Sequence, residues 1–153
     1  MNNNELIQKL NWFYSLELNQ VDLYMAQSKQ IKSKDFYISK VLERASYIEQ
    51  QHVNNIADKI KSLGKTPTSL GDVIAPILGK MSGNVVARTG LITMLKINIM
   101  LEKKAMDDYK NLIMKIEKED DLFTLLWSNL IDEDLHTSWF SSKIQELEKG
   151  LGK

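Results

Sequence analysis

Cysteine is absent from all 153 residues of the chain. Without thiolates the protein cannot build an iron–sulfur cluster, a zinc–thiolate site or a disulfide, so oxygen and nitrogen ligands must hold any metal. A chain without cysteine is consistent with a reducing compartment. We therefore predict a cytoplasmic protein.

The chain also lacks an excess of either charge, because 20 basic residues balance 20 acidic ones. No net field favours nucleic acid, which we exclude as a partner. No apolar run approaches the ~18 residues of a membrane-spanning helix. The first residues, MNNNELIQKLNW, have no cationic stretch before an apolar core, so we expect no signal peptide. The length predicts one domain, 1–153.

Proline and glycine are scarce and cluster in the middle of the chain. Both prolines and four of the seven glycines lie within residues 64–84. These residues break helices, so the segment reads as a connection. Within it, residues 70–78 are predicted to form a short helical turn.

The flanking sequences show the 3.6-residue periodicity of amphipathic helices. We predict four long helices, at 3–30, 35–62, 85–117 and 120–148. Short links join the first pair and the last pair as antiparallel hairpins, whereas the middle link is long enough to cross the length of a bundle. The predicted fold is all-α, a four-helix bundle with one long crossover between helices two and three.

Each predicted apolar stripe is interrupted near its middle by a glutamate: Glu17, Glu49, Glu102 and Glu133. Burying ionised carboxylates without partners is very costly. Three solutions exist: the helices rotate to expose the glutamates, the carboxylates become protonated, or a cation neutralises them.

The chain has only two histidines, and the positions of both favour the third solution, a bound cation. His52 follows Glu49 by three residues, and His136 follows Glu133 by three residues. Residues three apart share one face of a helix, so each histidine joins a glutamate on the same stripe.

The two halves of the chain repeat this pattern. Glu17 is followed seven residues later by Tyr24, and Glu102 by Tyr109 at the same spacing. Each half is thus a hairpin with Glu on its first helix and Glu-x-x-His on its second. Four carboxylates and two imidazoles suit two divalent ions, and such a ligand set without thiolate suits iron or manganese, although zinc would also bind.

The arrangement resembles the ferritin-like di-iron carboxylate superfamily over nearly the whole chain. The segment IDEDLHTSW, residues 131–139, is similar to the fourth-helix signature of bacterioferritin, and Tyr24 matches a tyrosine near its site. The resemblance implies a ferritin-like bundle and two iron ions. It implies these ligand roles: terminal carboxylates Glu17 and Glu102, bridging carboxylates Glu49 and Glu133, and terminal imidazoles His52 and His136.

A second resemblance concerns the connection. The segment TPTSLGDVIAPILGKMSG, residues 66–83, is similar in style to the crossover of demethoxyubiquinone hydroxylases. It implies contact with a quinone or a peripheral membrane surface. The sequence ends soon after the fourth predicted helix, so we expect no fifth helix and no 24-subunit cage. The missing CxxC pairs exclude a rubredoxin-like domain, so an external electron donor is expected.

Three functional hypotheses follow. The first is a di-iron oxidoreductase that reacts with dioxygen or peroxide and either hydroxylates a quinone-like substrate or reduces peroxide itself. The second is a ferroxidase or other iron-handling protein. The third is a bundle whose metals only stabilise the fold.

Other side chains have less specific roles. Tyr24 and Tyr109 are candidates for electron transfer or for hydrogen bonds to metal-bound carboxylates, and core packing explains them equally well. Gln20, Asn98 and Asn129 also lie on core stripes and are predicted to support the site. The three tryptophans, Trp12, Trp127 and Trp139, are predicted to pack in the core. An apolar helix face would allow a homodimer.

Overall fold

The computed structural model describes residues 1–78, 90–118 and 120–151. The regular structure in these ranges is α-helical, with five helices. None of the helices in the described ranges has the length and hydrophobicity needed to span a bilayer. The chain forms two compact units, Met1–Val73 and Ile74–Lys153, and each contains one long antiparallel hairpin.

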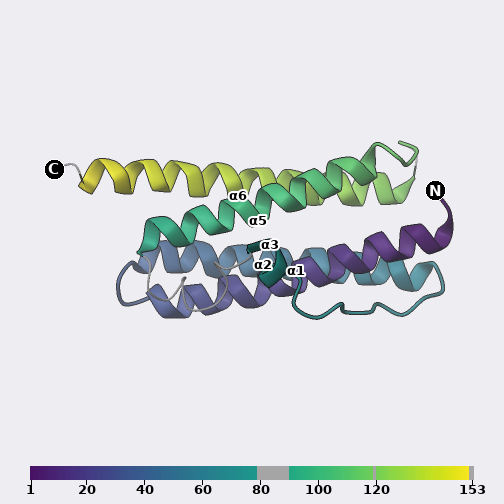
Figure 1. Cartoon of the computed structure of the whole chain (residues 1–153), viewed down its shortest axis with the longest axis horizontal. Helices are drawn as coiled ribbons and strands as arrows, with labels where there is room; N and C mark the ends of the chain where they lie inside the picture. Colours follow the sequence, from purple (N-terminus) through teal and green to yellow (C-terminus); the bar gives the residue numbers. More distant parts are fainter. Residues whose placement is uncertain (79–89, 119, 152–153) are drawn as a thin grey trace. The chain divides into compact units, whose positions relative to one another are not determined.

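The first unit contains α1 (Asn3–Ile31) and α2 (Phe36–Ser62), which run antiparallel (Figure 1). Asn2 starts α1 with a capping box, because its side chain accepts from the Glu5 amide at 2.9 Å and its own amide donates to the Glu5 carboxylate at 3.1 Å. Asp35 caps α2 by accepting from the Ile38 amide at 2.9 Å. Both starts agree with the sequence prediction to within one residue.

The C-terminal end of α2 is a Schellman motif. The Lys65 amide donates to the Ile60 carbonyl at 3.2 Å, and the Gly64 amide donates to the Lys61 carbonyl at 2.9 Å. Gly64 adopts φ +75°, a left-handed conformation that costs glycine little. The motif ends the hairpin and turns the chain back along α1.

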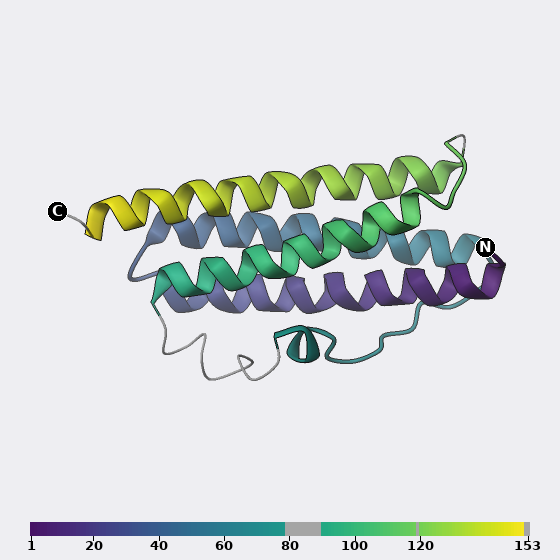
Figure 2. The same ribbon diagram turned by 45° about the horizontal axis from the view of Figure 1, so that its top comes forward.

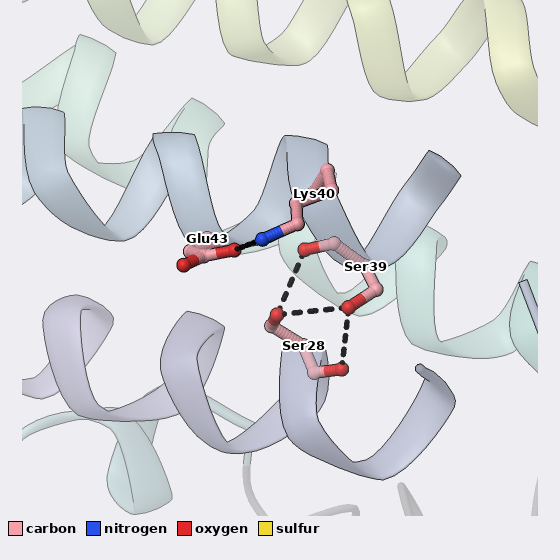
Figure 3. Close-up of polar contacts among 4 residues, drawn as sticks. All are labelled: Ser28, Ser39, Lys40 and Glu43. Atoms are coloured by element: carbon pink, nitrogen blue, oxygen red, sulfur yellow. Dashed lines mark hydrogen bonds and ion pairs between the residues drawn. The ribbon is translucent and has the colours of Figure 1, made fainter. Parts of the chain in front are cut away.

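Small polar side chains hold α1 against α2. Ser28 and Ser39 each donate through Oγ to the other's backbone carbonyl, both at 2.8 Å, and their hydroxyl oxygens are 3.1 Å apart (Figure 3). Two turns further along α2, the Ser46 hydroxyl donates to the Val21 carbonyl of α1 at 2.8 Å. Serine is small enough for the two backbones to approach closely, and these bonds fix the register of the two helices.

The connection after α2 is fixed along α1 by a row of polar side chains one turn apart. Three backbone amides of the connection donate to this row at 2.8–2.9 Å. The row has a spacing of four residues that is visible in the sequence, but the sequence pattern did not predict these contacts. The bonds are Thr68 to Asn11 Oδ1, Leu70 to Ser15 Oγ, and Val73 to Asn19 Oδ1.

The second unit contains α3 (Ile74–Leu78), α5 (Leu91–Ile113) and α6 (Asp121–Leu151). Figure 2 shows α5 and α6 as a long antiparallel hairpin. The short helical turn expected within residues 70–78 is confirmed as α3. The predicted start of the third helix, residue 85, lies outside the described residues.

The predicted end of that helix, residue 117, is wrong, because α5 ends at Ile113. There the backbone changes to tighter turn bonds, with the Lys115 amide donating to the Leu112 carbonyl at 2.9 Å. Ile116 keeps the apolar spacing but belongs to the turn. Asp120 lies directly before the next helix, and its carboxylate accepts a hydrogen bond from the Leu122 amide in the first turn at 2.8 Å.

The surface ion pairs are expected to contribute little. The Lys40 ammonium lies 2.6 Å from the Glu43 carboxylate on the exposed side of α2 (Figure 3). Its hydrogen bond lowers the pKa of Glu43 below the usual value. Solvent screens such pairs, so we assign the stability of this hairpin to its buried contacts.

Substituting Ser39→Ala is expected to lower the free energy of unfolding by about 1–2 kcal/mol. The variant loses two buried hydrogen bonds of Oγ, each with a typical net contribution of about 0.5–1.5 kcal/mol. Urea denaturation followed by circular dichroism measures the change. Ser62→Ala is the control, because its hydroxyl bonds only to the Lys59 carbonyl on the exposed end of the helix. Equal effects of both substitutions would show that the buried serine pair does not stabilise the hairpin.

Candidate metal centre

The first hairpin brings three predicted ligands together. Glu17 comes from α1, and Glu49 and His52 come from successive turns of α2. Both carboxylates are fully buried, and the histidine is 2% exposed. His52 Nδ1 lies 3.0 Å from Glu49 Oε2 and 3.5 Å from Glu17 Oε2. One imidazole nitrogen therefore lies close to a carboxylate from each helix.

The second hairpin contains the matching set. Glu102 comes from α5, and Glu133 and His136 come from α6. Both carboxylates are again fully buried. His136 Nδ1 lies 3.5 Å from Glu102 Oε1, and the histidine side chain is 12% exposed. The internal repeat in the sequence therefore corresponds to two similar ligand clusters, which we call the first and second half-sites.

The spacing within each half-site fits a metal ion. In each cluster, one ligand atom from every residue lies within 4.8 Å of those from the other two. Carboxylate oxygens and imidazole nitrogens bind divalent transition metals at about 2.0–2.2 Å, so ligand atoms on opposite sides of one ion lie about 4.0–4.4 Å apart. Small side-chain rotations would bring all three ligands of a half-site onto a common ion.

The electrostatics of each half-site also favour a cation. Two ionised carboxylates and one neutral imidazole carry a formal charge of −2 in a buried environment. Such burial is very unfavourable unless the charge is compensated. A single divalent ion balances that charge and accepts all three ligands. The donor set contains no sulfur, which suits iron or manganese, and zinc is also compatible.

Both predicted tyrosines are buried close to polar amides. The Tyr24 hydroxyl accepts a hydrogen bond from Gln20 Nε2 on its own helix at 3.4 Å. The Tyr109 hydroxyl accepts from Asn129 Nδ2 on the neighbouring helix α6 at 3.1 Å. Because each amide fills an acceptor position, the phenolic O–H of each tyrosine can donate. Roles for these tyrosines in redox chemistry or in orienting the ligands stay predictions.

The burial of the other predicted residues divides them into two groups. Gln20, Asn98 and Asn129 are buried, as the core stripes indicated. The prediction that Trp127 packs in the core is wrong, because this side chain is 50% exposed. It lies well away from the helix face that carries Glu133, and its hydrophobicity alone suggested burial.

The family and fold comparisons agree with each other. The family profile described as ferritin-like domain matches residues 7–150. A search of curated protein sequences finds no significant match. Among solved structures, a bacterioferritin of Mycobacterium tuberculosis, BfrA, superposes with a TM-score of 0.80, covering 97% of this chain and 89% of that chain at 18% identity.

At that identity, the structural match establishes the fold and not the function. It confirms the predicted all-α fold, which resembles the four-helix bundle of bacterioferritin. Neither match supports the resemblance of the crossover to demethoxyubiquinone hydroxylases. Part of that crossover, residues 79–83, lies outside the described residues.

Glu49→Gln is expected to change the stability of the metal-free and metal-loaded proteins in opposite directions. Without metal, the neutral amide removes buried negative charge at constant shape, so we expect a gain of about 1–2 kcal/mol, or a melting temperature higher by roughly 3–8 °C. With metal, the variant loses a ligand. The wild type should gain about 2.7 kcal/mol at a metal concentration 100-fold above Kd, and the variant should gain much less. Differential scanning calorimetry with and without Mn²⁺ measures both effects.

The control for this experiment is Glu43→Gln, the same change at a partly exposed position of the same helix, away from the half-site. It should leave the response to metal unchanged. A Glu49→Gln protein that keeps the full metal-dependent rise in melting temperature would remove Glu49 from the ligand set.

Proposed function

Because the chain belongs to the ferritin-like domain family, we propose that it is an iron-handling protein that binds ferrous iron and oxidises it. The observation that carries this proposal is the matched pair of Glu, Glu, His half-sites, one in each hairpin, whose four carboxylates are fully buried. The iron ions are substrate here, and the chain supplies the sites that hold them.

The proposed complement is two ions per chain, one for each half-site. We propose that Glu49 supplies the second carboxylate of the first half-site and that Glu133 supplies the second carboxylate of the second half-site. Four carboxylates then offset a charge of about +4, while the two imidazoles leave coordination positions for an oxidant. Carboxylates are also hard ligands that continue to bind after iron becomes ferric, which favours oxidation at this site.

The reaction that we propose balances with dioxygen as the oxidant. Each of two ferrous ions gives one electron, and dioxygen takes up both electrons and two protons to leave as hydrogen peroxide. The buried environment keeps bulk water from the ligands, since the four carboxylates are fully buried. Return of the iron to the ferrous state would need an external electron donor, because the chain has no cysteine with which to build an electron-transfer centre.

The alternative is an oxidoreductase that keeps its two metals and acts on an organic substrate. Its ligands would be the same, so the half-sites do not separate the two hypotheses. The comparison with a bacterioferritin favours iron handling. Hydroxylation of a quinone-like substrate receives no support from the comparisons, and we do not propose it.

Turnover with excess iron distinguishes these functions. Protein prepared without oxygen should bind about two Fe²⁺ per chain, and exposure to dioxygen should oxidise further additions of Fe²⁺ in repeated cycles. Stopped-flow absorbance of ferric iron and an oxygen electrode measure the rate and the stoichiometry. Glu102→Ala should reduce the rate at least tenfold, because losing a residue that only supports a metal ligand already costs about 10–100-fold in affinity or activity, and Glu102 is proposed as a ligand itself.

Asp107→Ala provides the matched control, since this carboxylate lies on the same helix in an exposed position. It should leave the rate within twofold of the wild type. One round of oxidation followed by tight retention of two metals would contradict iron handling and would support the resident-cofactor alternative.

A further inference from the structure

Helix α6 carries an exposed apolar row on the side opposite its buried face. Trp127, Ile131 and Leu135 follow one another at intervals of four residues and are 50%, 47% and 62% exposed. Phe123 extends the row by one turn, because its ring stacks on Trp127 with centroids 6.2 Å apart and an interplanar angle of 4°. The buried side of α6 also carries large apolar side chains, such as Leu122, Leu126 and Phe140. The helix is therefore largely apolar on two opposite sides, a pattern typical of a covered helix.

The charge pattern around the row also differs from that of a water-facing helix. Between Lys118 and Lys143 the sequence contains no Lys or Arg. Among the exposed positions beside the row, Thr124, Ser128 and Ser138 are small and uncharged, and Asp134 carries a charge. In contrast, the exposed positions of α5 are rich in charged side chains. These positions include Lys96, Lys103, Asp107 and Lys110.

We propose that this apolar row binds a second copy of the chain, with α6 packed antiparallel against α6 about a two-fold axis at Ile131. Symmetric interfaces of this kind join one patch to itself, so the patch must be self-complementary. Trp127 and Leu135 each lie four residues from Ile131, on opposite sides. The two-fold axis therefore sets Trp127 of each copy against Leu135 of the other.

The proposed two-fold axis also brings a hydrogen-bond donor close to Asp134, the carboxylate beside the row. Asp134 lies three residues from Ile131, on the side where the Trp127 ring of the second copy enters the interface. The indole N–H is a donor without acceptor capacity, so it can donate to that carboxylate. The pairing therefore joins an anionic acceptor to a neutral donor and brings no two like charges together.

Other occupants fit the surface less well. A membrane surface carries anionic headgroups and attracts helices whose apolar face is flanked by Lys or Arg, and residues 119–142 of this chain have neither. A strongly anionic protein partner would find no Lys or Arg in residues 119–142 with which to pair. A second copy does not depend on Lys or Arg beside the row, and the indole N–H of its Trp127 can donate to Asp134.

The size of the row predicts a reversible dimer. It runs from Phe123 to Leu135, a rise of about 18 Å along the helix at 1.5 Å per residue. A pair of helices in contact over this length lies at the low end of specific interfaces, at or below about 1,200 Å² in total. We therefore expect dissociation constants in the micromolar range. This association depends on the outer face of α6 and not on the metal ligands, so it does not rest on the proposed function.

Sedimentation velocity over a range of concentrations tests the dimer, with metal-free and metal-loaded protein. The wild type should shift from monomer to dimer over the micromolar range, and Ile131→Glu should weaken the association at least 100-fold, because it places two like charges at the axis. Met114→Glu is the control, since this methionine is 84% exposed and lies outside the row. It should associate like the wild type. Circular dichroism confirms that both variants keep their helices.

A disulfide test identifies the face directly. Since the chain has no cysteine, Ile131→Cys introduces a single thiol at the proposed axis. Mild oxidation should convert it to a covalent dimer much faster than it converts Met114→Cys. A wild type that stays monomeric up to millimolar concentration would overturn the proposal. A dimer that survives Ile131→Glu, or equal crosslinking of the two cysteine variants, would place the interface elsewhere and overturn it as well.

Discussion

Buried negative charge is the constraint on which the organisation of this protein depends. Each hairpin contains two fully buried glutamates and a histidine on facing helices. Ionised carboxylates rarely occupy such positions without compensation, because the desolvation cost amounts to several kcal/mol for each ion. The energetic balance of each hairpin therefore favours a bound cation. A metal bound by these residues would therefore also stabilise the fold.

The rest of each hairpin keeps these ligands in register. In the first hairpin, the Ser28–Ser39 pair and the Ser46 bond fix how far α1 slides along α2. A shift of one helical turn would separate Glu17 from Glu49 and His52. The backbone bonds and the caps are thus part of the site, since they set which turns face each other. In the second hairpin, Asn129 links α6 to Tyr109 of α5 one turn away from Glu133.

The two faces of α6 differ in character. The inner face carries the candidate ligands Glu133 and His136, whereas the outer face carries Trp127, Ile131 and Leu135, which are exposed in the single chain. A helix that only carried the half-site would have a charged outer face. The apolar outer face instead fits association between copies, and the two roles do not compete because they use opposite sides of the helix.

The sequence by itself determined the helices and the six candidate ligands. Periodicity gives helix position to within a turn, and the spacing of Glu49 with His52 and of Glu133 with His136 has a direct meaning on a helix face. Local pattern could not give the end of α5, because Ile116 keeps the apolar spacing while the backbone has already turned. Nor could it place Trp127, because hydrophobicity indicates that a side chain avoids water but not which surface covers it. Only the tertiary structure decided which turns of paired helices meet, since contacts such as Ser28 with Ser39 join residues whose proximity depends on how the two backbones pack.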